Sequence, residues 1–376
     1  MIVAAPTPSR WTVDQVAGAA TQQGWALPVI LPNEVHAIMP GQVVWDMWPL
    51  AHPDGRTVVR DGRQLWFFLS APRVDDPDDR HDVARIRLTT RGTDGWCDHG
   101  EVFPDGFTAG SREWSGSAVL GSDGATVTHY FTASGRREGG PRFEQRLFAS
   151  IGQLHGPGDA PRIDGWAVPE EVVETDPRFY APAKQDAAVD DRIKGFRDPG
   201  WFRDPADGRE YILFTGSAAG SADTHDGVVG IARREGERWT TLPPILDATG
   251  VNSELERAHI VVAAGRYYLF WSTQAKRFAP GVAGPTGLYG MVADRMGGPW
   301  RPANGTGLVA GNPPAEPFQA YCWWVTGELE VASFVDLFGL EGRSPATLEK
   351  PHGRFFGGAP APFFRLSVDG DRVAIV

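Results

Sequence analysis

Apolar runs of five or six residues, each preceded by a glycine-containing turn, recur along the chain. Four of them begin after Asp61-Gly62, Asp123-Gly124, Asp207-Gly208 and Gly265-Arg266, and occupy residues 65–70, 127–131, 211–215 and 267–271. The runs are rich in aromatic and β-branched residues, and a glycine turn before such a run predicts a β-hairpin. Further strands are expected at 287–292 and 329–335. Because the runs are apolar without alternation, we expect both faces of each strand to be buried.

The spacing of these hairpins favours a β-propeller over a sandwich. They follow one another at intervals of roughly 60 to 85 residues, and dividing 376 residues by five leaves about 75 for each four-stranded blade. The repeat is degenerate, so the pattern alone leaves other all-β folds open. One short helix is expected at residues 13–20, capped by Ser9 or Thr12, with Asp14 in its first turn. No linker-like segment divides the chain, and we expect one domain over residues 1–376.

Composition excludes several classes of protein. The 46 glycines and 31 prolines make up about a fifth of the chain, which argues against a helical bundle. A net charge of −11 argues against nucleic acid or an anionic membrane as a partner. No apolar run approaches the roughly 18 residues of a transmembrane helix. The N-terminus lacks the basic region of a signal peptide, which leaves a cytoplasmic location or export without a cleaved signal as expectations.

The two cysteines, Cys97 and Cys322, are 225 positions apart. They allow one disulfide, but two unpaired thiols are the favoured interpretation. The Cys and His residues do not have zinc-site spacing, so no structural zinc is expected.

Two aspartates stand in apolar surroundings. Asp46 lies between Trp45 and Trp48, where a carboxylate suffers a desolvation penalty unless it is hydrogen-bonded or functional. Asp198 follows Arg197, whose charge favours an ionised neighbouring carboxylate. The alternative for each is an aspartate in a turn before a proline.

A glutamate pair and a tryptophan segment add to these candidates. On a strand, Glu254 and Glu256 would share a face, and Arg257 would point away unless the backbone turns. Two like charges on one face raise the pKa of at least one, which keeps a general acid protonated. Trp114 and Ser115 suit a sugar subsite, with a stacking ring beside a hydroxyl. Two carboxylates flanking a glycosidic bond are the minimal glycosidase arrangement.

Several spaced motifs resemble glycoside hydrolase family 68, which contains levansucrases, inulosucrases and bacterial β-fructofuranosidases. The matching segments are Ser9–Thr12, Val44–Pro49, Glu113–Ser117, Phe196–Pro199, Glu254–Ala258, Tyr268–Phe270, Gly284–Gly290 and Gln319–Tyr321. They cover most of the chain in the family's order. The resemblance implies a single five-bladed propeller with a funnel-shaped pocket on its axis.

The resemblance also implies a retaining double displacement on sucrose, with fructose passed to water or to a sugar acceptor. Asp46 looks like the nucleophile, Asp198 like the transition-state stabiliser, and Glu256 like the general acid/base. A retaining pair is expected to lie roughly 5–5.5 Å apart. The sucrose-binding shell would comprise Trp45, Trp114, Ser115, Arg197, Glu254, Arg257 and Tyr321. By family analogy the protein would be secreted, and no cofactor is implied.

Three positions depart from the family pattern. Ser253 stands where Gram-positive members have an acidic calcium ligand, so we expect no metal. Gln274 stands where the family has Arg or His on the acceptor side, which puts polymer synthesis in doubt. Met47 replaces a small or hydroxyl residue beside the nucleophile. The alternatives to a sucrose-cleaving enzyme are a related propeller glycosidase acting on fructans or arabinose-containing glycans, and a non-catalytic carbohydrate-binding propeller.

Overall fold

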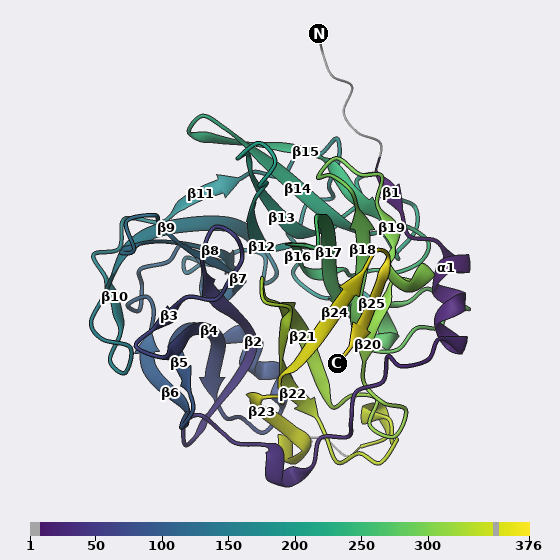
Figure 1. The fold of residues 1–376 in the computed structure, drawn as a ribbon, viewed down its shortest axis with the longest axis horizontal. Coiled ribbons are helices and arrows are strands. Elements are labelled where there is room, and N and C mark those ends of the chain that lie inside the picture. The colour runs from purple at the N-terminus through teal and green to yellow at the C-terminus, as the bar shows by residue number, and fades with distance from the viewer. Residues whose placement is uncertain (1–7, 349–352) are drawn as a thin grey trace.

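The strands are arranged as five antiparallel blades around a central axis in the computed structural model, which describes residues 8–348 and 353–376 (Figure 1). Blade I contains β2 (Gln42–Ala51), β3 (Val59–Arg60), β4 (Arg63–Pro72), β5 (Arg85–Gly92) and β6 (Gly95–Glu101). Blade II contains β7 (Arg112–Leu120), β8 (Thr126–Ser134), β9 (Gln145–His155), β10 (Arg162–Asp164) and β11 (Glu170–Val173). Blade III contains β12 (Phe196–Arg203), β13 (Glu210–Ser217), β14 (Gly227–Glu235) and β15 (Arg238–Asp247).

Blades IV and V complete the ring. Blade IV contains β16 (Glu256–Ala263), β17 (Arg266–Thr273), β18 (Gly287–Ala293), β19 (Arg301–Pro302) and β20 (Leu308–Gly311). Blade V contains β21 (Ala320–Val325), β22 (Glu330–Leu337), β23 (Phe356–Pro360), β24 (Phe364–Asp369) and β25 (Arg372–Ile375). The short helical elements are α1 (Val13–Ala17), η1 (Gly18–Thr21), η2 (Pro32–Glu34), η3 (Pro77–Asp82), η4 (Ala275–Arg277), η5 (Ala303–Gly305), η6 (Pro345–Thr347) and η7 (Gly353–Phe355). The predicted five-bladed propeller is confirmed.

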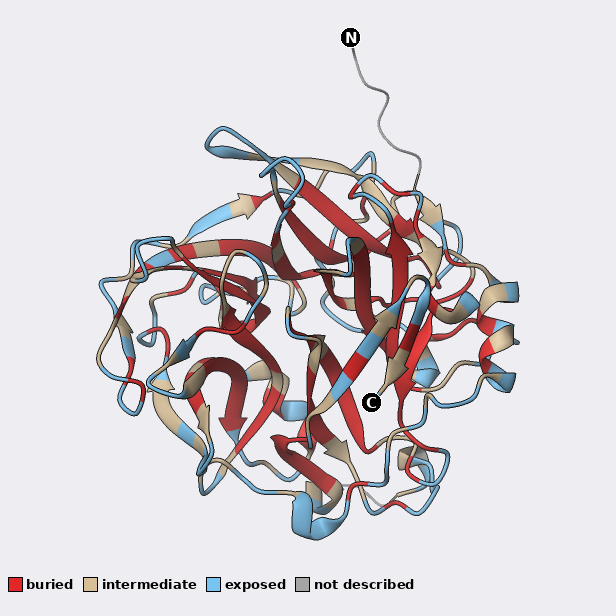
Figure 2. Cartoon of the chain, in the orientation of Figure 1, coloured by how far each residue is buried: buried red, intermediate tan, exposed pale blue. Residues whose placement is uncertain are grey.

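The predicted apolar runs are the second strands of the blades. They fall in β4, β8, β13, β17 and β22, and the run at 287–292 lies in β18. Each second strand pairs with neighbours on both sides, and their residues are mostly buried (Figure 2). Burial on both faces explains why these strands show continuous apolar runs in place of alternation.

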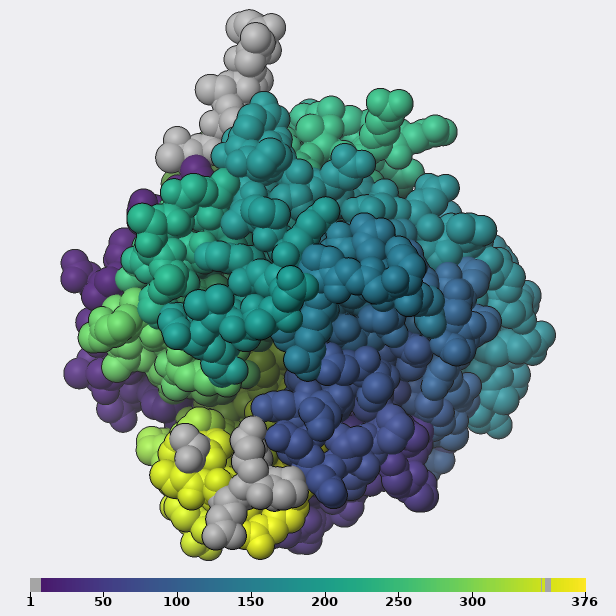
Figure 3. Space-filling view, turned by 180° about the vertical axis from the view of Figure 1, so that it is seen from behind, coloured from purple at the N-terminus to yellow at the C-terminus, as the bar shows by residue number. Residues whose placement is uncertain are grey.

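The first strands of the blades line the axis. Strands β2, β7, β12, β16 and β21 contact one another in chain order, and β21 contacts β2. Blades I and II also join through a parallel pairing of Leu50 with Ala118. Seen from behind, the yellow C-terminal segments lie beside the blue segments of blade I (Figure 3). The ring is therefore closed by contact between the first and last blades.

The N-terminal segment packs against blades III and IV. Strand β1 (Ser9–Arg10) pairs in parallel with β15. Thr12 is the N-cap of α1, and its side-chain oxygen accepts the backbone N–H of Gln15 in a capping box. Trp11 is fully buried, and its ring centroid lies 5.2 Å from that of Trp271. Its indole N–H donates to the Thr306 carbonyl oxygen at 2.9 Å. The indole therefore anchors the segment to the core.

Two further findings concern membrane-spanning helices and the cysteines. Within residues 8–348 and 353–376, no helix is long and apolar enough to cross a membrane. Cys97 is exposed and Cys322 is buried, and both are free thiols. The favoured interpretation of two unpaired cysteines therefore agrees with the structure.

We expect Trp11→Ala to lower the free energy of unfolding by roughly 3–5 kcal/mol, because it leaves a cavity among aromatic rings and removes a buried hydrogen bond. Urea unfolding of the two proteins measures the difference. Val13→Ala, at a position 43% exposed, is the control, and its effect should stay within about 0.5 kcal/mol. A loss below about 1 kcal/mol in Trp11→Ala would show that the segment is not anchored in this way.

Candidate active site

A β-bulge interrupts the first strand of every blade. The register shifts between Trp45 and Met47, Trp114 and Gly116, Arg197 and Gly200, Glu256 and His259, and Tyr321 and Trp324. At four of the bulges a non-glycine residue has a positive φ: Asp46 (33°), Asp198 (62°), Arg257 (57°) and Cys322 (54°). A bulge re-aims the side chain it carries, and such strained residues cluster at functional sites. The bulges bring the sequence-predicted residues together.

Gly116 is required by this geometry in blade II. A Cβ atom at this position would lie 1.8 Å from the carbonyl oxygen of Tyr130 on the neighbouring strand. The glycine lets β7 approach β8 immediately after the bulge, and Ser115 is thereby held beside the axis.

Arg197 is the centre of the site. Its guanidinium Nη2 donates to Oε1 of Glu254 and, at 2.7 Å, to Oε1 of Glu256, while its Nε lies 3.5 Å from Oδ2 of Asp198. The arginine is 5% exposed. Burial acts to lower the pKa of Arg197, but the charges of Glu254 and Glu256 raise it well above its usual value. Arg197 is therefore a fixed positive charge shared by three carboxyl groups.

The two glutamates are held in different states. Arg277 Nε lies 2.6 Å from Glu254 Oε2. Burial favours the neutral form of Glu254, yet Arg277 and Arg197 together lower its pKa below the usual value. Burial, and then the negative charge of Glu254, raise the pKa of Glu256 to about 7. Glu256 also accepts a hydrogen bond from the Tyr321 hydroxyl. Glu254 is thus ionised and Glu256 takes up a proton near neutral pH.

Asp46 lies on β2 and is partly open to solvent. Its side chain is 16% exposed, the same fraction as that of Glu256. The Ser115 hydroxyl donates to Asp46 Oδ2 at 2.5 Å, and Arg257 Nη1 lies 4.0 Å from the same oxygen. Asp46 is therefore oriented at the open side of the cluster.

Asp198 is more deeply enclosed. Thr215 donates its hydroxyl to Asp198 Oδ2 at 2.9 Å, and the Asp198 backbone N–H donates to Thr132 Oγ1 at 2.9 Å. Burial raises the pKa of Asp198 against the opposing effect of Arg197, and the charge of Asp46 adds to the rise. The carboxyl is therefore fixed in place between Arg197 and the Asp46 side of the site.

Arg257 points into the site because the backbone turns at its positive φ. Its Nη2 donates to the Met47 carbonyl oxygen at 3.0 Å, and its guanidinium lies over the rings of Trp48 (5.2 Å) and Trp324 (5.3 Å). From the sequence, we expect Arg257 to point away from the two glutamates unless the backbone turns. The positive φ of Arg257 shows that the backbone does turn.

Trp45 and Trp114 both contact His81 of η3. Trp114 donates its indole N–H to the His81 carbonyl oxygen at 3.1 Å, and the Trp45 ring meets the His81 ring edge-on at 5.7 Å. Trp45 is 1% and Trp114 7% exposed. Arg80, which is also buried, has its guanidinium 5.3 Å from the Trp45 ring. Trp45 therefore packs mainly against protein, and Trp114 keeps only a small open edge.

Some residues of the site were missed from the sequence. Arg277, the partner of Glu254, ends η4, and its backbone N–H donates to the carbonyl oxygen of Gln274 at 2.9 Å. The available signal was a pair of basic residues, ending at Arg277, a few positions after the strand predicted at 267–271. The sequence analysis assigned a role only to Gln274 in this segment. Thr215 and Thr132 were missed because each lies inside an ordinary strand and contacts Asp198 only through folding.

Ser253 takes part in holding η4. Its backbone N–H donates to the Arg277 carbonyl oxygen at 2.9 Å. Within residues 8–348 and 353–376, no group of three or more His, Cys, Asp or Glu residues has an arrangement suited to a metal ion. The expectation that the protein binds no calcium stays a prediction.

Comparison with known proteins matches the whole length of the chain to one family. The family described as Levansucrase/Invertase matches residues 2–230 and 222–376. The levansucrase LscA of Pseudomonas savastanoi pv. glycinea is 31% identical over 373 residues, which cover 88% of this chain and 85% of that protein. The levansucrase of Erwinia amylovora is 31% identical over 381 residues, and the match covers 89% of this chain and 86% of that protein.

A solved structure agrees with these relatives. The structure of the inulosucrase from Halalkalicoccus jeotgali bound to kestose superimposes with a TM-score of 0.88 and 37% sequence identity. The match covers 98% of this chain and 95% of that one. Sequence and fold therefore indicate the same family.

We expect Arg197→Gln to lower the free energy of unfolding by about 3–5 kcal/mol near pH 8, because buried carboxylates lose their counter-charge. In this variant the buried carboxyl groups bind protons more tightly in the folded state than in the unfolded state. The loss of unfolding free energy relative to the natural protein should therefore shrink toward about pH 5. Urea unfolding at both pH values measures this. Arg203→Gln, which removes an exposed partner of Glu210, is the control and should show little pH-dependent change. A deficit that is equal at both pH values would contradict the charge argument.

Proposed function

The chain belongs to the levansucrase and invertase family, and from this premise we propose that it splits sucrose and passes the fructosyl unit to water or to a sugar acceptor. The observation that carries the proposal is the convergence of Asp198 and Glu256 on Arg197, with Asp46 held beside them by Ser115 and Arg257. The relatives are named levansucrases and an inulosucrase, which supports sucrose as the donor. We also propose that residues 1–376 form one catalytic domain.

In the proposed first step, Asp46 attacks the anomeric carbon of the fructosyl unit. Glu256 donates its proton to the glycosidic oxygen, so that glucose leaves as a neutral sugar and a fructosyl ester forms on Asp46. In the second step, the Glu256 carboxylate takes the proton of water or of an acceptor hydroxyl. The oxygen then attacks the same carbon and Asp46 is released. Two displacements at one carbon retain its configuration.

The different environments of the two carboxyls suit these roles. A pKa of about 7 lets Glu256 hold a proton near neutral pH and release it within the cycle. The hydrogen bond from Ser115 orients the side chain of Asp46. Both side chains are 16% exposed, so substrate can reach them.

Asp198 and the basic residues complete the proposed machinery. Asp198 binds fructose hydroxyls while positive charge develops on the fructosyl ring, and its carboxyl favours that charge. Arg197, Glu254, Arg257 and Tyr321 form the polar part of the sucrose-binding shell, with Trp45, Trp114 and Ser115 on the fructosyl side. Gln274 lies at the start of η4, next to the arginine that holds Glu254, and is proposed to face the acceptor.

We expect Asp46→Asn to lower the rate of glucose release from sucrose by roughly 10⁴-fold or more, because the amide is not a nucleophile. Acid quenching during turnover, followed by mass measurement, should show one fructosyl adduct on the natural protein and none on the variant. Asp61→Asn is a matched control, since Asp61 also has a positive φ, 48°, but is exposed in a turn. Unchanged glucose release, or an adduct that persists in Asp46→Asn, would assign the nucleophile elsewhere.

The pH profile tests the role of Glu256. We expect kcat/KM for sucrose to fall as the pH rises through about 7, because Glu256 loses the proton it must donate. Glu254→Gln removes a negative neighbour, so the pKa of Glu256 should fall and the alkaline limb should move to lower pH. Initial rates of glucose release across the pH range give the alkaline limb of the natural protein and that of the variant. A limb that stays in place, or moves upward, in Glu254→Gln would contradict the assignment.

A further inference from the structure

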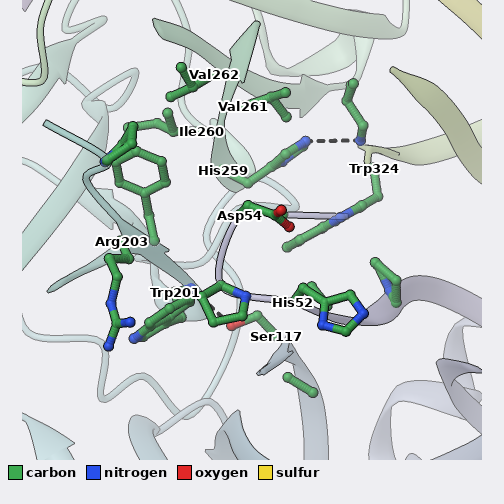
Figure 4. A pocket seen from close by; sticks show the side chains of 18 residues that line it. His52, Asp54, Ser117, Trp201, Arg203, His259, Ile260, Val261, Val262 and Trp324 are labelled. Carbon is green, nitrogen blue, oxygen red and sulfur yellow. Dashed lines mark hydrogen bonds between the residues drawn. The ribbon is translucent and has the colours of Figure 1, made fainter. Parts of the chain in front are cut away.

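A cavity of about 390 Å³ is lined by residues that lie further along the axial strands than the carboxylate cluster. Figure 4 shows the side chains around it, among them Trp201, His259 and Trp324. The first strand of every blade contributes to its lining, through Ala51, Ala118, Trp201, Val262 and Trp324 among others. Each of these lies three to six positions further along its strand than the residue that faces the catalytic cluster. A strand rises about 3.3 Å per residue, so the cavity is roughly 10–20 Å from the carboxylates. It therefore opens toward the opposite end of the propeller.

A layer of packed side chains separates the cavity from the catalytic site. The Trp324 ring stacks on the His259 ring, with centroids 4.3 Å apart and planes at 9°. The Arg257 guanidinium lies 5.3 Å from the centroid of the Trp324 ring and 4.0 Å from the Asp46 carboxylate. Trp324 thus contacts the cavity directly and Asp46 only through Arg257. The two sites are distinct but share a wall.

The enclosed part of the cavity is apolar, and its buried polar atoms are already bonded. Ser117 Oγ donates to the Pro199 carbonyl oxygen at 2.8 Å and accepts the Trp201 N–H at 2.9 Å. His259 donates from Nδ1 to the Arg257 carbonyl oxygen at 2.8 Å and accepts the Val325 N–H on Nε2 at 2.9 Å. A sugar enclosed here would lose water from its hydroxyls without gaining these partners, which is costly. The lining therefore disfavours a second carbohydrate site.

The charges at the rim are compensated. Arg203 is paired with Glu210 at 2.7 Å and lies 5.8 Å from the Trp201 ring. Asp54 is paired with Arg56, also at 2.7 Å. Neither charged group needs a ligand to neutralise it.

Flat surfaces are available in the cavity, since Trp201 and Trp324 are both only half-buried.

We propose that this cavity is a second ligand site, specific for a small neutral molecule with a flat aromatic body. Its volume lies within the roughly 300–1,000 Å³ of small-molecule sites, and two indole rings offer offset or edge-on stacking. An aromatic body needs no buried hydrogen-bond partner, which matches the apolar lining. The site is independent of the proposed reaction, because its ligand would not contact Asp46 or Glu256.

The test uses N-phenyl-1-naphthylamine, a neutral aromatic dye, as the probe for the whole protein. We expect saturable binding by calorimetry and an increase in dye emission. Ala51→Trp and Val262→Trp each place an indole in the cavity from a different wall, and either should weaken binding at least tenfold. Ala374→Trp, at an equally half-buried position on the outer strand β25, is the matched control and should bind like the natural protein.

Sucrose separates this site from the catalytic one. With the Asp46→Asn variant, which should leave sucrose intact, a high sucrose concentration should not displace the dye. Displacement by sucrose would place the dye in the catalytic site and overturn the proposal. So would equal binding by the natural protein and by folded cavity variants, or the absence of saturable binding. Dye located outside the cavity in a soaked crystal of the natural protein would overturn it as well, even if both cavity variants failed to fold.

Discussion

One buried guanidinium, that of Arg197, holds together a cluster that would otherwise repel itself. Three carboxyl groups within its reach compete for one positive charge, in surroundings where charge interactions are much stronger than in water. Arg277 adds a second positive charge on the side of Glu254 only. The imbalance leaves Glu254 ionised and drives a proton onto Glu256. Glu256, the acid of the proposed first step, is therefore protonated beside an ionised Glu254 because the cations around the two glutamates are unequally placed.

The propeller supplies the geometry for this electrostatic arrangement. Five first strands meet at the axis, and the bulge in each turns a side chain toward the centre. Positive φ at residues such as Asp46 and Asp198 costs of order 1–3 kcal/mol each. The surrounding blades offset that cost, because second strands buried on both faces hold the first strands in place. A few residues further on, the same five strands enclose the cavity lined by Trp201 and Trp324. The wall between that cavity and the catalytic site is made of Arg257 and the rings it contacts.

Much of the fold could be predicted from the chain. A glycine turn followed by an apolar aromatic run predicted β4, β8, β13 and β17, since local turn chemistry and burial act over a few residues. The three carboxyls, Arg197 and Tyr321 were identified through motifs that resemble a known family. Thr215 and Arg277 were not, because their contacts with Asp198 and Glu254 join segments 17 and 23 positions apart and form only when the chain folds.

By itself, the sequence determined where the second strands of the blades form and which family the chain resembles, and that resemblance implied the five-bladed arrangement. These properties depend on local pattern and on residue identity. Only the tertiary structure decided the direction of Arg257, which a positive φ turns into the site, and the division of charge between Glu254 and Glu256. It also decided that Trp45 is packed within the protein, whereas Trp201 and Trp324 face a cavity. Burial and the distance between charges are properties of the closed ring, because five distant segments contribute to each of them.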